Sequence, residues 1–66
     1  MDPKEIFETI IKADERVKYS NEANMDQRKQ QAIELLRQAR DAAREIGNEA
    51  LVQQAEQRLA DLGATT

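Results

Sequence analysis

The chain contains no cysteine, no histidine and no tryptophan, and it has one phenylalanine and one tyrosine. Without cysteine, neither a disulfide nor a thiolate metal site can stabilise the fold. Without histidine, the chain lacks the commonest metal ligand and the commonest general acid or base. So few aromatic residues also leave no interleaved surface on which bases could stack. We therefore expect no enzyme activity, no cofactor, no bound metal and no nucleic-acid partner.

Long apolar runs and a basic charge balance are missing too. The N-terminal stretch M-D-P-K-E has no apolar segment of the kind that follows the start of a signal peptide. No stretch approaches the ~20 apolar residues of a membrane span. The 66 residues carry a formal net charge of −3, whereas a dedicated nucleic-acid binder is normally basic. The expectation is a single small domain over residues 1–66 that is cytoplasmic and has neither a membrane partner nor a small-molecule substrate.

Proline and glycine are scarce, and each occurs where a helix would begin or end. Pro3 follows Asp2, which can cap free backbone N–H groups, and Glu5 stands three residues after Asp2, as in a capping box. Apolar residues then follow at spacings typical of one helix face: Ile6, Phe7, Ile10, Ile11, Ala13 and Val17. This pattern predicts a helix over residues 3–19.

A polar stretch over residues 20–24 interrupts the periodicity and predicts a loop, with one long bent helix as the alternative. Asn24 and Gln27 have the spacing of a second capping box. A heptad seam follows, formed by Met25, Lys29, Ala32, Leu36, Ala39, Ala43 and Ile46. The additional apolar residues Ile33, Leu35 and Ala42 widen this seam. It predicts a helix over residues 25–46 that contacts two neighbours, as the middle helix of a bundle must.

Glycine and asparagine stand together at Gly47-Asn48, inside a stretch that otherwise favours helix. Gly47 suits the positive φ of a helix end, and Asn48 suits the start of the next helix. A third helix is predicted over residues 49–62, with Leu51, Val52, Ala55, Leu59 and Leu62 on one side. Gly63 would end it, and a frayed tail is expected from about residue 63. The predicted fold is an all-α, three-helix up-down-up bundle, and disorder is disfavoured because the apolar residues are periodic.

Residues 32–51 read A-I-E-L-L-R-Q-A-R-D-A-A-R-E-I-G-N-E-A-L. This stretch resembles a tetratricopeptide-repeat-like helical hairpin, and the resemblance extends over about residues 32–62. Ala32, Leu36 and Ala39 fit the family's small-large-small spacing, and Gly47-Asn48 fits its turn into the next helix. Microtubule-interacting-and-trafficking domains have a similar three-helix outline, and a generic three-helix bundle is a further alternative. Tetratricopeptide repeats and microtubule-interacting-and-trafficking domains both bind proteins, so the resemblance implies a protein-binding module.

Basic residues gather in the middle of the chain. Five basic and two acidic residues give positions 27–44 a net charge of +3, in a chain whose net charge is −3. Arg37, Arg40 and Arg44 are spaced by three and four residues, so they share one helical face. One interpretation is an ordinary solvated face, paired through Asp41 and the acidic flanking helices. The other is a surface for an acidic protein partner.

The third helix supplies the predicted partner-binding residues. Its apolar side chains occupy two adjoining stripes, one with Leu51, Ala55 and Leu62 and the other with Val52 and Leu59. If one stripe closes the core, Val52 and Leu59 are exposed and can contact an amphipathic helix. The basic residues Arg37, Arg40 and Arg44 would then steer that partner. The predicted function is a non-catalytic protein-interaction module that binds another protein or a second copy of itself. A purely structural homodimer is the alternative.

Overall fold

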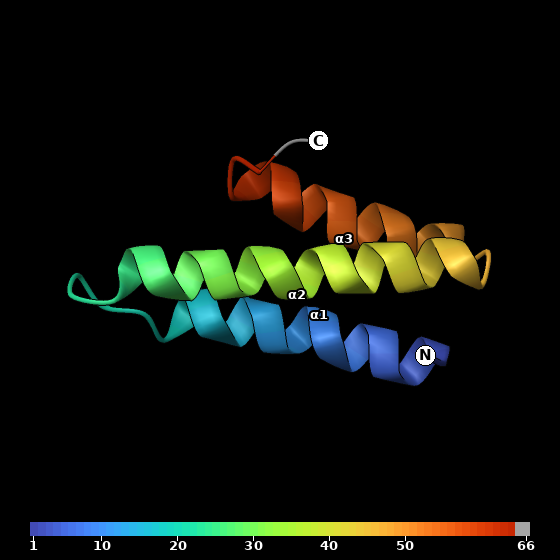
Figure 1. Cartoon of the computed structure of the whole chain (residues 1–66), viewed down its shortest axis with the longest axis horizontal. Coiled ribbons are helices and arrows are strands. Elements are labelled where there is room, and N and C mark those ends of the chain that lie inside the picture. Colours follow the sequence, from blue (N-terminus) through green and yellow to red (C-terminus); the bar gives the residue numbers. More distant parts are fainter. Residues whose placement is uncertain (65–66) are drawn as a thin grey trace.

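Three helices make up the fold in the computed structural model, which describes residues 1–64. They are α1 (Pro3–Lys18), α2 (Met25–Glu45) and α3 (Glu49–Asp61). α1 and α3 run in the same direction, and α2 runs antiparallel to both (Figure 1). The predicted all-α, up-down-up three-helix bundle is confirmed. Each helix boundary lies within one residue of the boundary predicted from the sequence.

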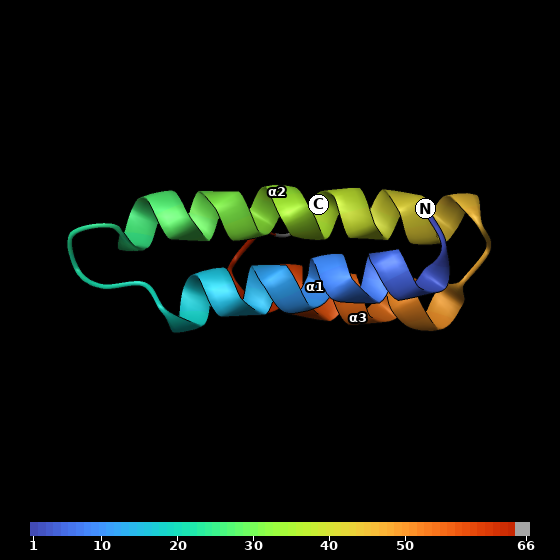
Figure 2. The same ribbon diagram turned by 90° about the horizontal axis from the view of Figure 1, so that it is seen from below.

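The bundle is flat, with principal extents of 38 × 22 × 13 Å. α2 lies between α1 and α3 in Figure 1, and the turned view shows both outer helices on the same side of α2 (Figure 2). Both outer helices pack mainly against α2 and contact each other much less. α1 and α3 therefore lie side by side and form one broad face of the molecule.

The core lies where the three helices meet, and its largest fully buried side chains are Ile6, Ile10 and Leu36. Leu36, at the centre of the predicted α2 seam, is 1% exposed, so its predicted burial is confirmed. The seam is buried only in its middle, because Met25 and Ile46 at its two ends are 51% and 43% exposed. The remaining buried apolar residues are Ala13, Ala32, Ile33, Ala39, Ala43, Leu51, Val52, Ala55 and Leu59.

The N-terminus of α1 is capped as predicted, whereas that of α2 is not. The backbone N–H of Glu5 donates to Asp2 Oδ1 at 2.8 Å, and Pro3 occupies the first turn of α1. The predicted capping box between Asn24 and Gln27 is wrong. Asn24 Oδ1 instead accepts from the Asn21 N–H at 2.8 Å, while Asn21 Oδ1 accepts from the Asn24 N–H at 3.1 Å. This reciprocal pair closes the loop before α2, so the Asn24 side chain is occupied outside the helix.

The turn between α2 and α3 has the geometry that glycine favours. Gly47 has φ +72°, and the Asn48 N–H donates to the Ala43 carbonyl at 2.8 Å. The Gly47 N–H donates to the Arg44 carbonyl at 3.1 Å, which completes a Schellman motif. The Asn48 side chain then accepts from the Leu51 N–H at 3.2 Å and caps α3. Both predicted roles, the end of α2 at Gly47 and the start of α3 at Asn48, are confirmed.

The same motif recurs at the end of α3. Gly63 has φ +77°, its N–H donates to the Ala60 carbonyl at 2.9 Å, and the Ala64 N–H donates to the Leu59 carbonyl at 2.8 Å. Ala64 also packs against the core. Gly63 and Ala64 therefore do not belong to a frayed tail, contrary to the prediction. The rest of the predicted tail, residues 65–66, lies outside the described residues.

Replacing Gly47 with alanine should lower the free energy of unfolding by about 1 kcal/mol, because an L-residue resists positive φ. No neighbouring atom lies within 4 Å of the position that the new Cβ would take, so the cost comes from backbone conformation alone. A thermal melt followed by circular dichroism should show a decrease of about 4–8 °C in Tm. Gly47→Asn is the matched control and should lose less, since asparagine tolerates left-handed backbone. A higher Tm for Gly47→Ala would mean that α2 and α3 form one continuous helix.

Candidate interaction surface

The apolar strip predicted on α3 is not exposed. Val52 and Leu59 are only 6% and 3% exposed, and both belong to the core. The physical reason is that α3 contacts α1 as well as α2, so it uses both of its adjoining apolar stripes. The expectation that one stripe would suffice is therefore wrong, and these two residues cannot provide a contact surface for a partner in this fold.

The predicted arginine stripe is paired with carboxylates. Arg44 reaches across to α3, where its Nη2 atom lies 2.7 Å from Oε1 of Glu56. Within α2, Arg40 lies 3.1 Å from Asp41, and Arg37 lies 3.9 Å from Glu34. The structure thus favours the solvated, internally paired face that the sequence left open as one interpretation. The Arg37 and Arg44 pairs are exposed and contribute only about 0–1 kcal/mol each.

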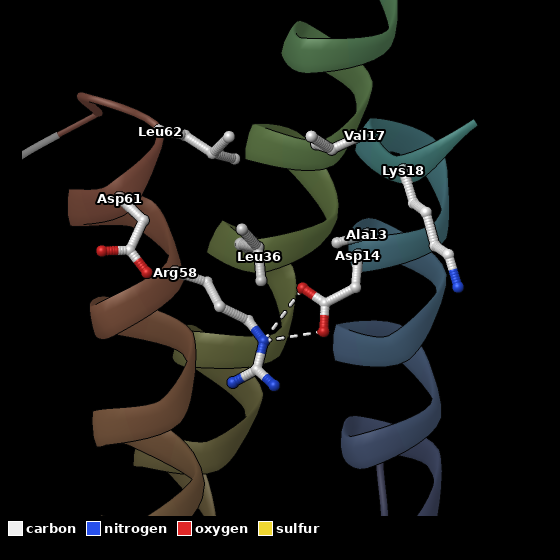
Figure 3. A pocket seen from close by; sticks show the side chains of 8 residues that line it. All are labelled: Ala13, Asp14, Val17, Lys18, Leu36, Arg58, Asp61 and Leu62. Atoms are coloured by element: carbon white, nitrogen blue, oxygen red, sulfur yellow. Dashed lines mark hydrogen bonds and ion pairs between the residues drawn. The ribbon is translucent and has the colours of Figure 1, made fainter. Parts of the chain in front are cut away.

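The open apolar surface lies between α1 and α3 instead. Figure 3 shows a groove whose floor is Leu36 of α2. Its α1 wall is formed by Ala13, Asp14, Val17 and Lys18, and its α3 wall is formed by Arg58, Asp61 and Leu62. Val17 is 37% exposed and Leu62 is partly buried, so the groove presents apolar side chains to solvent.

One ion pair crosses this groove and connects its two walls. Arg58 Nε lies 2.9 Å from both carboxylate oxygens of Asp14 (Figure 3). The side chains are 30% and 44% exposed, so the pair lies at the surface and contributes little free energy. It does show which residues of the two parallel helices are level with each other. Asp14 is level with Arg58, and the turns on either side of these residues are therefore level as well.

The same face continues in both directions from the ion pair. On α1, Phe7, Ile11 and Lys18 share the side of Asp14, because the spacings are four, three and four residues. Phe7 is 45% exposed and Ile11 is partly buried. Toward the 19–24 loop, Val17 and Leu62 also line a second hollow with Met25 and Lys29 of α2. This hollow exists because α2 has eight more residues than α3, about 12 Å of helix.

We call this surface the α1/α3 face and define it by its residues. The α1 residues are Phe7, Ile11, Asp14, Val17 and Lys18, and the α3 residues are Gln54, Arg58, Asp61 and Leu62. The sequence carries a signal for this face. Two adjacent apolar pairs, Ile6-Phe7 and Ile10-Ile11, widen the apolar arc of α1 beyond what contact with α2 requires.

The comparisons with known proteins add no assignment. The chain matches no protein-family model, no curated protein and no solved structure. The tetratricopeptide-like relationship of residues 32–62 stays a prediction. Within residues 1–64, no helix has the length and apolar character needed to cross a membrane, and the acidic side chains form no group that could hold a metal ion.

Proposed function

We propose that the protein is a non-catalytic interaction module whose α1/α3 face binds an amphipathic helical surface. The observation that carries this proposal is the groove between two parallel helices, with the buried Leu36 as its floor and the exposed Val17 on its wall. Helices bind such grooves by placing apolar side chains at spacings of three and four residues.

The shape of the groove supports a helical rather than a small-molecule ligand. The groove is open to solvent along its length, whereas small-molecule sites are clefts or cavities that enclose most of the ligand. The face, by contrast, extends along both outer helices from Phe7 to Lys18 and from Gln54 to Leu62. An elongated apolar face with charged residues along its edges suits a helix that lies parallel to α1 and α3.

The tetratricopeptide-like resemblance is compatible with this proposal. If Gly47-Asn48 is the turn between two repeats, α1 and α3 hold equivalent places before and after α2. Two equivalent parallel helices would then form the binding face. The repeat relationship is part of this proposal, but the α1/α3 face can bind a helix without it.

The test is to select helical peptides from a displayed amphipathic library against the full chain and to map the bound peptide by NMR. Backbone amide shifts should change at the α1/α3 face, including Ile11, Val17 and Leu62. Val17→Lys should weaken binding about tenfold or more, since it places a charge in the apolar groove. Ile46→Lys is the matched control, because Ile46 is similarly exposed at 43% and does not line the groove. Both lysines lie at helix C-termini, where a cation is compatible with the helix dipole.

Two results would overturn the proposal. In the first, the shifts would map to the opposite side of α2, around Arg37 and Glu34. In the second, Val17→Lys and Ile46→Lys would weaken peptide binding equally. Circular dichroism spectra of both variants should match the parent, which separates a loss of binding from a loss of fold.

A further inference from the structure

We propose that the partner of the α1/α3 face is a second copy of this chain, related by a two-fold axis parallel to the helices. This inference rests on the proposed function, because it names the partner of the same face. Two features of the face favour a second copy over a foreign helix: its charge and the positions of its charged residues.

The charges on the α1/α3 face sum to zero and are divided between its walls. Asp14 and Lys18 lie on α1, whereas Arg58 and Asp61 lie on α3. Asp14 and Arg58 pair with each other. Lys18 contacts the Tyr19 ring and Asp61 accepts from the Gln57 side chain, but neither charge forms an ion pair among residues 1–64. A strongly acidic or strongly basic partner would therefore find no net complement here. A surface with one uncompensated charge of each sign can complement itself.

The positions of these two charges fit a two-fold axis. Lys18 points away from α3, whereas Asp61 lies on the near side of α3 with its carboxylate directed along that helix (Figure 3). A two-fold axis parallel to the helices, above the groove, places α1 of one copy over α3 of the other at the same level. Since Asp14 is level with Arg58, Lys18 then lies opposite Asp61 of the second copy. Both edges of the interface gain one such pair.

The same operation covers the exposed apolar side chains. Phe7 lies two turns before Asp14, so it lies opposite the turn that contains Ala50 and Leu51 of the second copy, two turns before Arg58. Ile11 and Val17 lie over α3 of the second copy in the same way.

The face has the size of a weak dimer interface. α1 has 16 residues, about 24 Å of helix, and the bundle is 22 Å wide, so the face covers about 530 Å², whereas a standard interface buries about 800 Å² per partner. A domain this small also gains from association, because about 60 residues bury a limited share of their surface alone. Two flat bundles joined by this face would form a six-helix assembly with Phe7 and Val17 inside it.

The test is sedimentation equilibrium of the full chain, the Lys18→Asp variant, the Asp61→Lys variant and an equimolar mixture of the two variants. The parent should shift from its monomer mass of 7.5 kDa toward twice that mass as concentration rises from about 10 µM to about 1 mM. Each variant alone should dimerise about tenfold or more weakly, because both edge pairs become like-charged. The mixture should recover dimerisation, because aspartate at position 18 then faces lysine at position 61, and lysine at 18 faces aspartate at 61.

The mixture separates contact between copies from an effect within one chain. In the mixture, each chain carries only one of the two substitutions. Recovery of association must therefore come from contact between the two chains. A parent that stays monomeric up to about 1 mM overturns the dimer. So does a dimer that both variants form as well as the parent does. In the monomeric case, selected peptides that still lose binding in Val17→Lys would leave the proposed function intact. Selected peptides that bind elsewhere on the chain would overturn the proposed function, whether or not the chain dimerises.

Discussion

Leu36→Ala should destabilise the domain by about 2–5 kcal/mol, which is the range for large-to-small substitutions at fully buried positions. Leu36 is 1% exposed and is the residue of α2 that forms the floor between α1 and α3. A domain of this size has about 3–5 kcal/mol of stability in total. The variant should therefore be largely unfolded at room temperature, with a loss of helical circular dichroism and no cooperative melt.

Leu35→Ala is the matched control for this experiment. The chemical change and the helix are the same, but the Leu35 side chain is only partly buried. Its loss should be about 1 kcal/mol, since only part of the apolar burial is removed. If Leu36→Ala melts cooperatively near the parent's Tm, Leu36 does not occupy the centre of the core.

The ends of the helices could be predicted because their signals are local. Asp2 with Pro3, and Gly47 with Asn48, act on backbone groups only a few residues away, so the sequence specifies both partners of each hydrogen bond. The exception at Asn24 has the same explanation. Asn21 and Asn24 are three residues apart and can bond each other as easily as either can cap a helix. The spacing of these residues allows either the Asn21–Asn24 pair or a helix cap at Asn24, and the capping-box prediction was the wrong choice.

The location of the open face could not be predicted in the same way. Periodicity shows which side of a helix is apolar, but not which neighbouring helix covers it. α3 carries two apolar stripes and α1 carries a wide apolar arc, so either helix could have left a stripe exposed. The choice depends on how far α1 and α3 lie apart across α2, which is a property of packing between distant segments. The Asp14–Arg58 pair, 44 residues apart in sequence, is a direct sign of that packing.

The second large effect concerns the α3 stripe that proved to be buried. Val52→Ser combined with Leu59→Ser should unfold the domain. Full burial of each apolar side chain is worth about 1.5–3 kcal/mol, and residues seven apart on one helix contribute nearly independently. The combined loss of about 3–6 kcal/mol is comparable to the whole stability of a domain this small. Urea unfolding followed by circular dichroism should show that most of the helical signal is lost before denaturant is added.

Val17→Ser combined with Met25→Ser is the matched control, because it makes two apolar-to-serine changes where the side chains are 37% and 51% exposed. This variant should unfold cooperatively at nearly the parent's urea concentration, since little apolar burial is lost. Its association should nevertheless weaken, because both residues line the groove region. The two double variants thus separate core from contact surface: one should lose the fold, and the other should lose association alone. If the pair at positions 52 and 59 instead kept a cooperative transition and lost only association, the exposed strip predicted from the sequence would be right and this packing of α3 would be wrong.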